Sequence, residues 1–200
     1  MSQRPKHIVI IQGHPNADRP HFCHALADAY TAGAGQADYE LETIDVASLE
    51  FPLIRSRGSV EHCAVPEAIR RAQRVLGRSD HIVLIFPVVN GAMPMLLTAF
   101  LEQTLTCPLV CPNAESDDCP RQCSPSTPRK TLAGRTGRIV ATMEMPASDY
   151  GWYLHPEKRI LRQSGVSPVQ ETLIGLVQAS NPRRRERWLR LMRTLGRRAR

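Results

Sequence analysis

The sequence contains two apolar runs that restrict the possible folds more than any other feature. They are HIVIIQG, residues 7–13, and HIVLIFP, residues 81–87. Both are rich in isoleucine and valine, both lack the polar alternation of a half-exposed strand, and both stop at a glycine or a proline. Runs of this kind are typical of strands buried on both faces of a parallel sheet. A chain with such strands needs helices on both faces of its sheet.

The rest of the chain supplies those helices and three more strands. Apolar residues at helical spacing predict helices over 21–35, 65–80, 94–105 and 182–196, and over part of 150–165. The helix over 182–196 is expected to end with Gly196 as its C-cap. Further strands are predicted over 39–46, 137–145 and 168–177. Five strands alternating with helices predict an α/β fold, with a doubly wound parallel sheet in one domain over 1–200. The proline-rich segment 106–130 has no periodicity and is expected to be an irregular loop.

The positive charge of the chain is concentrated at its carboxyl end. The net charge is +7, but the last twenty residues alone hold nine arginines and one glutamate, so the rest is close to neutral. This favours one basic terminal helix over a general nucleic-acid-binding surface. We expect Trp188 and the leucines of this helix to pack on the sheet and its arginines to face water; binding of an acidic surface is the alternative.

Two absences in the sequence bear on where the protein works. No window approaches 18 consecutive apolar residues, so no membrane span is expected. The amino-terminal MSQRPKH leads directly into a predicted strand, without the apolar core of a signal peptide. We therefore expect a cytoplasmic protein.

Three predicted strands end on the same edge of the sheet. In open parallel sheets, ligands bind beyond the carboxyl ends of the strands, where the strand order reverses. The segments at this edge are GHPNADRPHFCHAL, FPVVNGAMP and TMEMPASDYGWY. They contain neither a P-loop nor the three-glycine dinucleotide fingerprint. A helix start near Pro20 would favour an anion, with donors from His14, Arg19 and His21; the alternative is that these are ordinary strand-to-helix turns.

The ordered set of these segments resembles the NAD(P)H quinone reductase family of flavodoxin-like flavoproteins over nearly the whole chain. The resemblance is carried by GHP…FCHALADAY, TIDV…LEFPLI, SDHIVLIFPVVNGAMPMLLTAFLEQTL, LAGRTGRIVATMEMPASDYGWY, SGVSPVQETLIGLV and the Arg/Trp-rich last helix. It implies a five-stranded sheet in the order 2-1-3-4-5 and a bound flavin, FMN or FAD. It also implies hydride transfer from NADH or NADPH to a quinone or similar acceptor. A homodimer with sites at its interface is expected, and nucleic acid is not expected as a partner.

The resemblance also implies roles for particular residues. The phosphate side of the cofactor maps to His14, Arg19, Pro20, His21, Phe22 and Cys23. The loop around the isoalloxazine ring maps to Pro87, Val88, Val89, Asn90 and Gly91. Backbone donors to the carbonyl edge of the ring map to Thr142, Met143, Glu144 and Met145. Tyr150 falls where the family has a tyrosine facing the substrate.

The chemistry of the residues themselves suggests roles for Tyr150, His155 and Cys23. Tyr150 and His155 are candidate acids that polarise a quinone oxygen; the alternative for His155 is a solvent-facing residue. The helix dipole lowers the pKa of a thiol at the position of Cys23, but a small packing residue beside the cofactor is the preferred interpretation.

The chain departs from the family in ways that bear on cofactor binding. Val89 and Asn90 stand where the family carries one or two tryptophans, which removes a stacking plate of about 150–250 Å². Pro20 stands where a hydroxyl residue often contacts the flavin phosphate. These departures favour an alternative function, a catalytically weakened regulatory or electron-transfer protein with the same fold.

Four cysteines crowd into the predicted loop. Cys107, Cys111, Cys119 and Cys123 have the spacing C-x3-C-x7-C-x3-C. Four thiolates could hold zinc or an iron–sulfur cluster, but the spacing differs from the common C-x2-C motifs. Disulfide formation and the absence of any role remain open, and no metal ligand is assigned.

Overall fold

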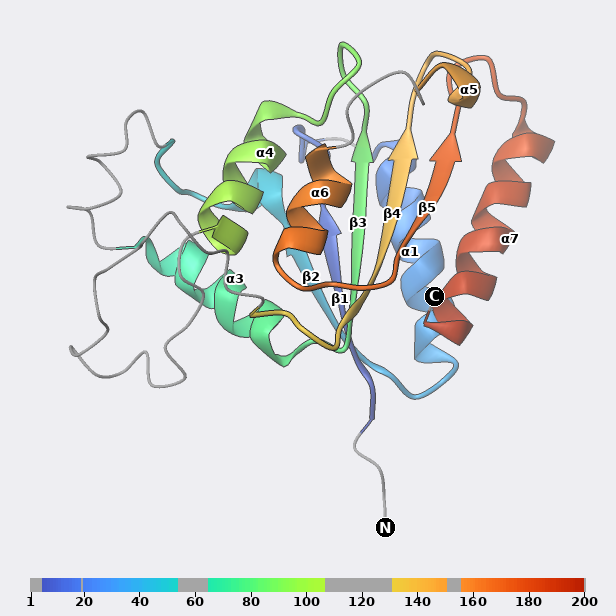
Figure 1. Cartoon of the computed structure of the whole chain (residues 1–200). Helices are drawn as coiled ribbons and strands as arrows, with labels where there is room; N and C mark the ends of the chain where they lie inside the picture. Colours follow the sequence, from blue (N-terminus) through green and yellow to red (C-terminus); the bar gives the residue numbers. More distant parts are fainter. Residues whose placement is uncertain (1–4, 19, 54–64, 107–130, 151–155, 200) are drawn as a thin grey trace, which may run out of the picture.

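A five-stranded parallel sheet forms the centre of the computed structural model, which describes residues 5–18, 20–53, 65–106, 131–150 and 156–199 (Figure 1). The strands are β1 (His7–Gln12), β2 (Glu40–Asp45), β3 (His81–Pro87), β4 (Thr136–Thr142) and β5 (Val169–Ile174). Their order in the sheet is β2-β1-β3-β4-β5, and every neighbouring pair is parallel. This confirms the predicted fold class and strand order.

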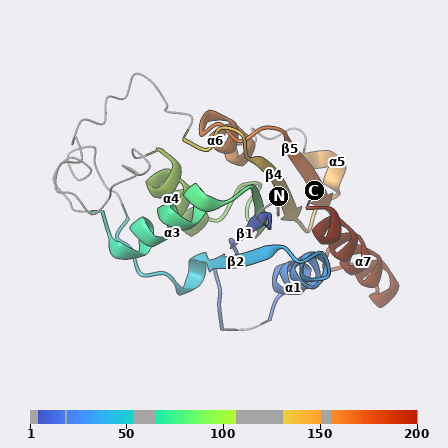
Figure 2. The ribbon, with the colours of Figure 1, turned by 90° about the horizontal axis from the view of Figure 1, so that it is seen from below.

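Helices cover both faces of the sheet, as its buried strands require. One face carries α1 (Phe22–Gly35) and α7 (Pro182–Arg198), and the other carries α3 (Glu67–Arg78), α4 (Met95–Leu101) and α6 (Pro156–Gln163) (Figure 2). Three shorter elements complete the described chain: a 3-10 turn over Val46–Ser48, a π-helical turn over Glu102–Thr106, and α5 (Ala147–Tyr150). No helix in the described ranges is long and apolar enough to cross a membrane.

Alternate residues of β1 supply two separate cores. Ile8 and Ile10 pack with Leu26 of α1 under one layer of helices, whereas Val9 and Ile11 pack under the other layer. All four side chains are fully buried. The unbroken apolar run therefore reflects burial on both faces rather than on one.

The sheet order places three loops side by side at the carboxyl edge. Strand β1 pairs with both β2 and β3, so the order reverses beside it. Backbone bonds continue past the strand ends there: Gly13 N donates to Ile85 O at 2.8 Å, and Val88 N donates to Thr142 O at 2.7 Å. The loops after β1, β3 and β4 therefore leave the sheet as neighbours, as the topology predicts.

The final helix differs from its prediction in where it ends and what it packs on. Gly196 is not its C-cap, because α7 continues to Arg198 and is capped by Ala199 in the left-handed conformation. Gly196 lies instead where α7 meets α1, and a Cβ atom there would be 2.1 Å from Tyr30 O. Leu191, predicted on the packed face, is 37% exposed, whereas Met192 is fully buried.

Candidate functional site

The loop between β1 and α1 brings three imidazole rings together. The rings of His14 and His21 stack at 3.8 Å between centroids and 18° between planes. The ring of His24 lies 5.4 Å from that of His14. Its Nδ1 accepts a hydrogen bond from His21 N at 3.1 Å, which ties the third ring to the loop. The expected pair His14 and His21 is thus part of a cluster of three.

This loop also leaves hydrogen-bond donors unused. Gln12 is 3% exposed; its Oε1 accepts from His14 N at 3.2 Å, and its Nε2 is buried without a partner. The Nε2 of His21 is likewise buried and unpaired. Within the described chain, the amides of Phe22 and Cys23 at the start of α1 donate to no other group. Together with the helix dipole, these donors form an electropositive cluster at the start of α1 that suits an anion.

Burial keeps part of this cluster neutral in the absence of a ligand. Desolvation lowers the pKa of His14, and the positive charges on His21 and His24 lower it further. A hydrogen bond with the backbone of Asn16 and the carboxylate of Asp45 oppose this shift. Bound phosphate would act in the same direction as Asp45, because an anion favours the imidazolium form.

The loop after β3 forms a two-residue hairpin. Val89 N donates to Ala92 O at 2.9 Å, and Ala92 N donates to Val89 O at 3.0 Å. Asn90 and Gly91 have φ values of 50° and 78°, which is the positive-φ pair of a type I′ turn. The hairpin projects beyond the sheet edge, and Val89 is 45% exposed (Figure 1). An exposed apolar tip therefore stands where the family has an indole, with Pro87 and Val88 half-buried beneath it.

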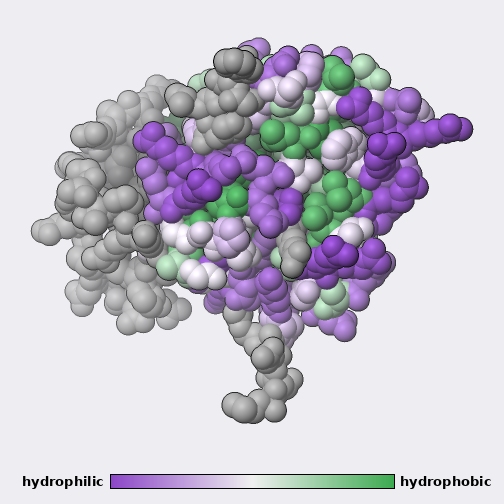
Figure 3. Space-filling view, turned by 45° about the vertical axis from the view of Figure 1, so that its right-hand side comes forward, coloured by the Kyte–Doolittle hydropathy of each residue, from purple (hydrophilic) through white to green (hydrophobic). Residues whose placement is uncertain are grey.

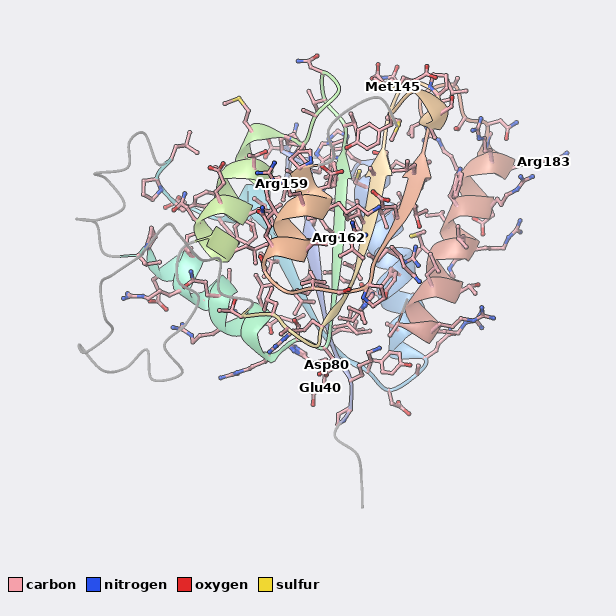
Figure 4. The ribbon with its side chains drawn as sticks, in the orientation of Figure 1. Glu40, Asp80, Met145, Arg159, Arg162 and Arg183 are labelled. Carbon is pink, nitrogen blue, oxygen red and sulfur yellow. The ribbon has the colours of Figure 1, made fainter. Side chains whose placement is uncertain are left out.

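The loop after β4 is held against the end of β5 by its backbone. Met143 N donates to Ile174 O at 2.9 Å, and Met143 O accepts from Val177 N at 3.1 Å. Met145 O accepts from Leu176 N, also at 3.1 Å. The amide of Met143 is thus already used, whereas those of Glu144 and Met145 donate to no group of the described chain. Figure 4 shows Met145 at this edge and Glu40 and Asp80 at the opposite one.

Cys23 and Thr142 connect the first and third loops below the surface. Cys23 Sγ lies 3.2 Å from Thr142 Oγ1, and both side chains are buried. Burial raises the pKa of the Cys23 thiol to about 11, although the hydroxyl of Thr142 acts against the rise. The thiol therefore stays protonated at neutral pH and serves as a small packing group.

Of the two candidate acids, the structure describes only Tyr150. Tyr150 is 1% exposed, and its hydroxyl donates to Glu157 Oε1 at 3.1 Å. Burial raises the pKa of Tyr150, and the carboxylate of Glu157 raises it further, so the phenol stays protonated. His155 falls outside the described residues, as do Arg19 and the four loop cysteines.

Two more residues of the first loop lie near the surface, and two hollows lie away from the three loops. Pro20 is exposed, and the ring of Phe22 is half-buried with the Arg185 guanidinium 5.4 Å above it. A hollow of about 430 Å³ lies on α6, and another of about 340 Å³ lies at the opposite sheet edge. The hollow on α6 is lined by Lys158, Arg159, Arg162 and Gln163. The hollow at the opposite edge is lined by Gly77, Arg78, Ser79, Asp80, Ala133, Gly134 and Arg135. Neither hollow includes a residue of the three loops.

Sequence reasoning missed two members of the site. Gln12 ends an otherwise apolar buried strand, and a polar residue in that position is the signal that could have identified it. His24 follows His21 by three residues at the start of a helix, which places both rings on one side. The unpaired donors of the first loop fit a flavin phosphate, and the free amides of Glu144 and Met145 fit the polar edge of its ring.

Comparisons with known proteins agree with this topology. The family model described as flavodoxin-like fold matches residues 6–193. The FMN-dependent NADH-azoreductase of Bacillus anthracis, solved with FMN, superimposes with a TM-score of 0.72 at 11% identity, covering 96% of this chain and 98% of its own. The NAD(P)H:quinone oxidoreductase of Methanothermobacter marburgensis gives 0.68 at 16% identity, covering 97% and 96%.

A third solved structure is similar, and the curated proteins give no match. Smu.1420 of Streptococcus mutans superimposes with a TM-score of 0.71 at 18% identity, covering 96% of this chain and 99% of its own. No curated protein matches the sequence significantly. The family model covers far more than half of the chain, and the sheet order agrees with it. The chain therefore belongs to the family of proteins with a flavodoxin-like fold.

Proposed function

We propose that this protein is a flavin-dependent NAD(P)H oxidoreductase that passes hydride from NAD(P)H through bound FMN to a quinone or similar acceptor. One observation carries the proposal: the loop at the switch point of the sheet holds buried, unpaired donors at the start of α1, beside two further loops. The names of two structural neighbours, an FMN-dependent NADH-azoreductase and an NAD(P)H:quinone oxidoreductase, support the same chemistry. The neighbour solved with FMN supports FMN rather than FAD.

The β1–α1 loop would hold the phosphate of the cofactor. The amides of Phe22 and Cys23 and the positive end of the α1 dipole favour a dianion. The Nε2 groups of Gln12 and His21 would supply two side-chain donors. Pro20 has no hydroxyl to donate to the phosphate, and these groups would supply donors in its place.

The second and third loops would hold the ring. The Asn90–Gly91 hairpin offers an apolar cover through Val89, and the amides of Glu144 and Met145 would donate to the carbonyl edge. When bound, a flavin supplies the redox chemistry, accepting hydride from NAD(P)H and passing electrons to the acceptor. Because Met143 and Met145 are bonded to the segment after β5, the third loop is held in place before a ligand arrives.

The acid groups and the assembly remain predictions within this proposal. Tyr150 holds its proton near the third loop, but its hydroxyl already donates to Glu157. The role of His155 as an acid rests on the chemistry of its imidazole. A homodimer with sites at its interface rests on the family resemblance, and a cytoplasmic location rests on the sequence alone.

Purified protein is expected to take up FMN and become yellow. Addition of NADPH or NADH without oxygen should bleach the flavin absorption, and a quinone should restore it. Riboflavin, which lacks the phosphate, should bind more weakly than FMN. A colourless protein that takes up neither FMN nor FAD would contradict the proposal and favour the regulatory alternative.

A His21→Phe variant is expected to bind FMN at least about tenfold more weakly, because it loses one donor to a charged group. Phenylalanine keeps a flat ring that can stack on His14, so the loop should keep its shape. Riboflavin affinity should not change, since riboflavin presents no phosphate. Isothermal titration of both ligands checks this; equal losses for FMN and riboflavin would show that His21 does not contact the phosphate.

A further inference from the structure

The last helix carries a row of arginines that the proposed function does not use. At about 100° per residue, Arg183, Arg187, Arg190 and Arg197 fall within a sector of about 80°. We call these four residues the arginine stripe. The first and last of them are 14 residues apart, which is about 21 Å along the helix. All four side chains are exposed.

The arginine stripe lies opposite the packed face of α7. Met192 and Gly196, on the other side of the helix, are buried against α1. Figure 2 shows α7 at the outside of its layer, and in Figure 4 Arg183 points away from the sheet. An approaching surface would therefore meet the stripe before the rest of this layer.

The charge of the stripe is not neutralised by the described chain. Glu186, the one acid of α7, pairs with Arg193 at 3.2 Å, and neither residue belongs to the stripe. Two other arginines turn inward: Arg184 donates to Gly175 O and Arg185 to Val177 O. Among the described residues, no carboxylate lies within ion-pair distance of the stripe.

We propose that the arginine stripe docks the protein onto an anionic lipid bilayer. Guanidinium groups pair with phosphate in a bidentate manner, and a straight row along one helix face matches a flat surface. The apolar face of α7 is already occupied by α1, so the helix lies on the headgroups and binds by charge. Figure 3 shows mostly hydrophilic residues on the right-hand side of the molecule, where α7 lies, and Leu191 of this helix is 37% exposed.

Lipid is favoured over nucleic acid by what the stripe lacks. The positions that flank it on α7, Glu186, Leu191 and Thr194, include no aromatic side chain to stack on a base. Outside the last twenty residues the chain is close to neutral, so no wider basic surface continues the stripe. The choice also rests in part on the proposed function, because a lipophilic quinone partitions into the bilayer. Docking would then raise the concentration of acceptor near the site without any contact between α7 and the reacting groups.

The test is binding of the full-length protein to vesicles. We expect it to sediment with vesicles of phosphatidylglycerol and phosphatidylcholine but not with phosphatidylcholine alone, and to release as salt is added. A variant R187Q/R190Q should bind about thirtyfold more weakly, which corresponds to about 1 kcal/mol for each arginine. The matched control R71Q/R78Q removes two exposed arginines of α3 and should change binding less than threefold.

The remaining outcomes would overturn the proposal. They are failure of the wild type to bind anionic vesicles, equal losses in R187Q/R190Q and the α3 control, or displacement from vesicles by a DNA duplex at equal phosphate concentration. Circular dichroism confirms that the variants are folded. Sedimentation needs no flavin, so a protein that binds vesicles but not FMN would contradict the proposed function and leave the docking intact.

Discussion

Replacing Gly33 by alanine is expected to destabilise the protein by about 3 kcal/mol or more. A Cβ atom at this position would lie 2.0 Å from Arg193 O and 2.7 Å from Arg193 C. These are backbone atoms of α7, so no side chain can rotate away. The two helices would have to separate, which opens the core around Met192. Urea unfolding measures the loss, and Gly196→Ala should behave alike because its Cβ would lie 2.1 Å from Tyr30 O.

Gly35 supplies a matched control in the same helix. A Cβ atom there meets nothing within 4 Å, and its φ is not positive. Gly35→Ala should therefore leave stability unchanged or raise it by up to about 1 kcal/mol, because alanine restricts the unfolded chain. Similar free energies of unfolding for Gly33→Ala and Gly35→Ala would show that α1 and α7 are not in close contact.

The glycine contact illustrates what the sequence could and could not predict about the fold. The strand over 81–87 is observed with the predicted bounds, because isoleucine and valine in an unbroken run leave few alternatives. Gly196 was assigned to a helix end because glycine is common there. Its actual role depends on Tyr30, far away in the sequence, and local spacing carries no information about that contact.

The candidate site, like the fold, could be predicted from the sequence only in part. The edge of the sheet and its three loops follow from topology, and Asn90-Gly91 is a typical hairpin pair. The path of the loop between β1 and α1 determines that His14 stacks on His21 and that the side-chain amide of Gln12 is left unpaired. Tyr150 matched the family by position, yet its hydroxyl contacts Glu157 of the next helix. Such pairings become visible only once the packing of helices on the sheet is known.

Acid is expected to destabilise the protein through His81. This residue is 2% exposed, its Nδ1 lies 2.6 Å from Thr136 Oγ1, and its Nε2 is buried without a partner. Burial, together with the charges of Lys6 and Arg138, lowers the pKa of His81 from 6.5 to about 3. Between these two pH values, the unfolded chain binds one more proton than the folded protein.

The stability due to neutral His81 is therefore complete above pH 6.5 and falls as the pH drops toward 3. At about 1.4 kcal/mol per pH unit, acidification to pH 5 should remove about 2 kcal/mol. A His81→Asn variant, which cannot titrate, should show a shallower dependence of the unfolding free energy on pH, whatever its absolute stability. His14, whose pKa is also lowered by burial, keeps its own contribution in that variant.

Thr136→Val separates the proton from the hydrogen bond. This substitution removes the hydroxyl beside His81 but keeps the buried imidazole. The free energy of unfolding should therefore fall at every pH, because a hydrogen bond is lost. Its dependence on pH between pH 5 and pH 6.5 should be the same as in the wild type. The His81 ring signals in NMR should show no titration across that interval in the folded protein. Equal slopes in wild type and His81→Asn would mean that another group takes up the proton and that His81 is not the source of the acid sensitivity.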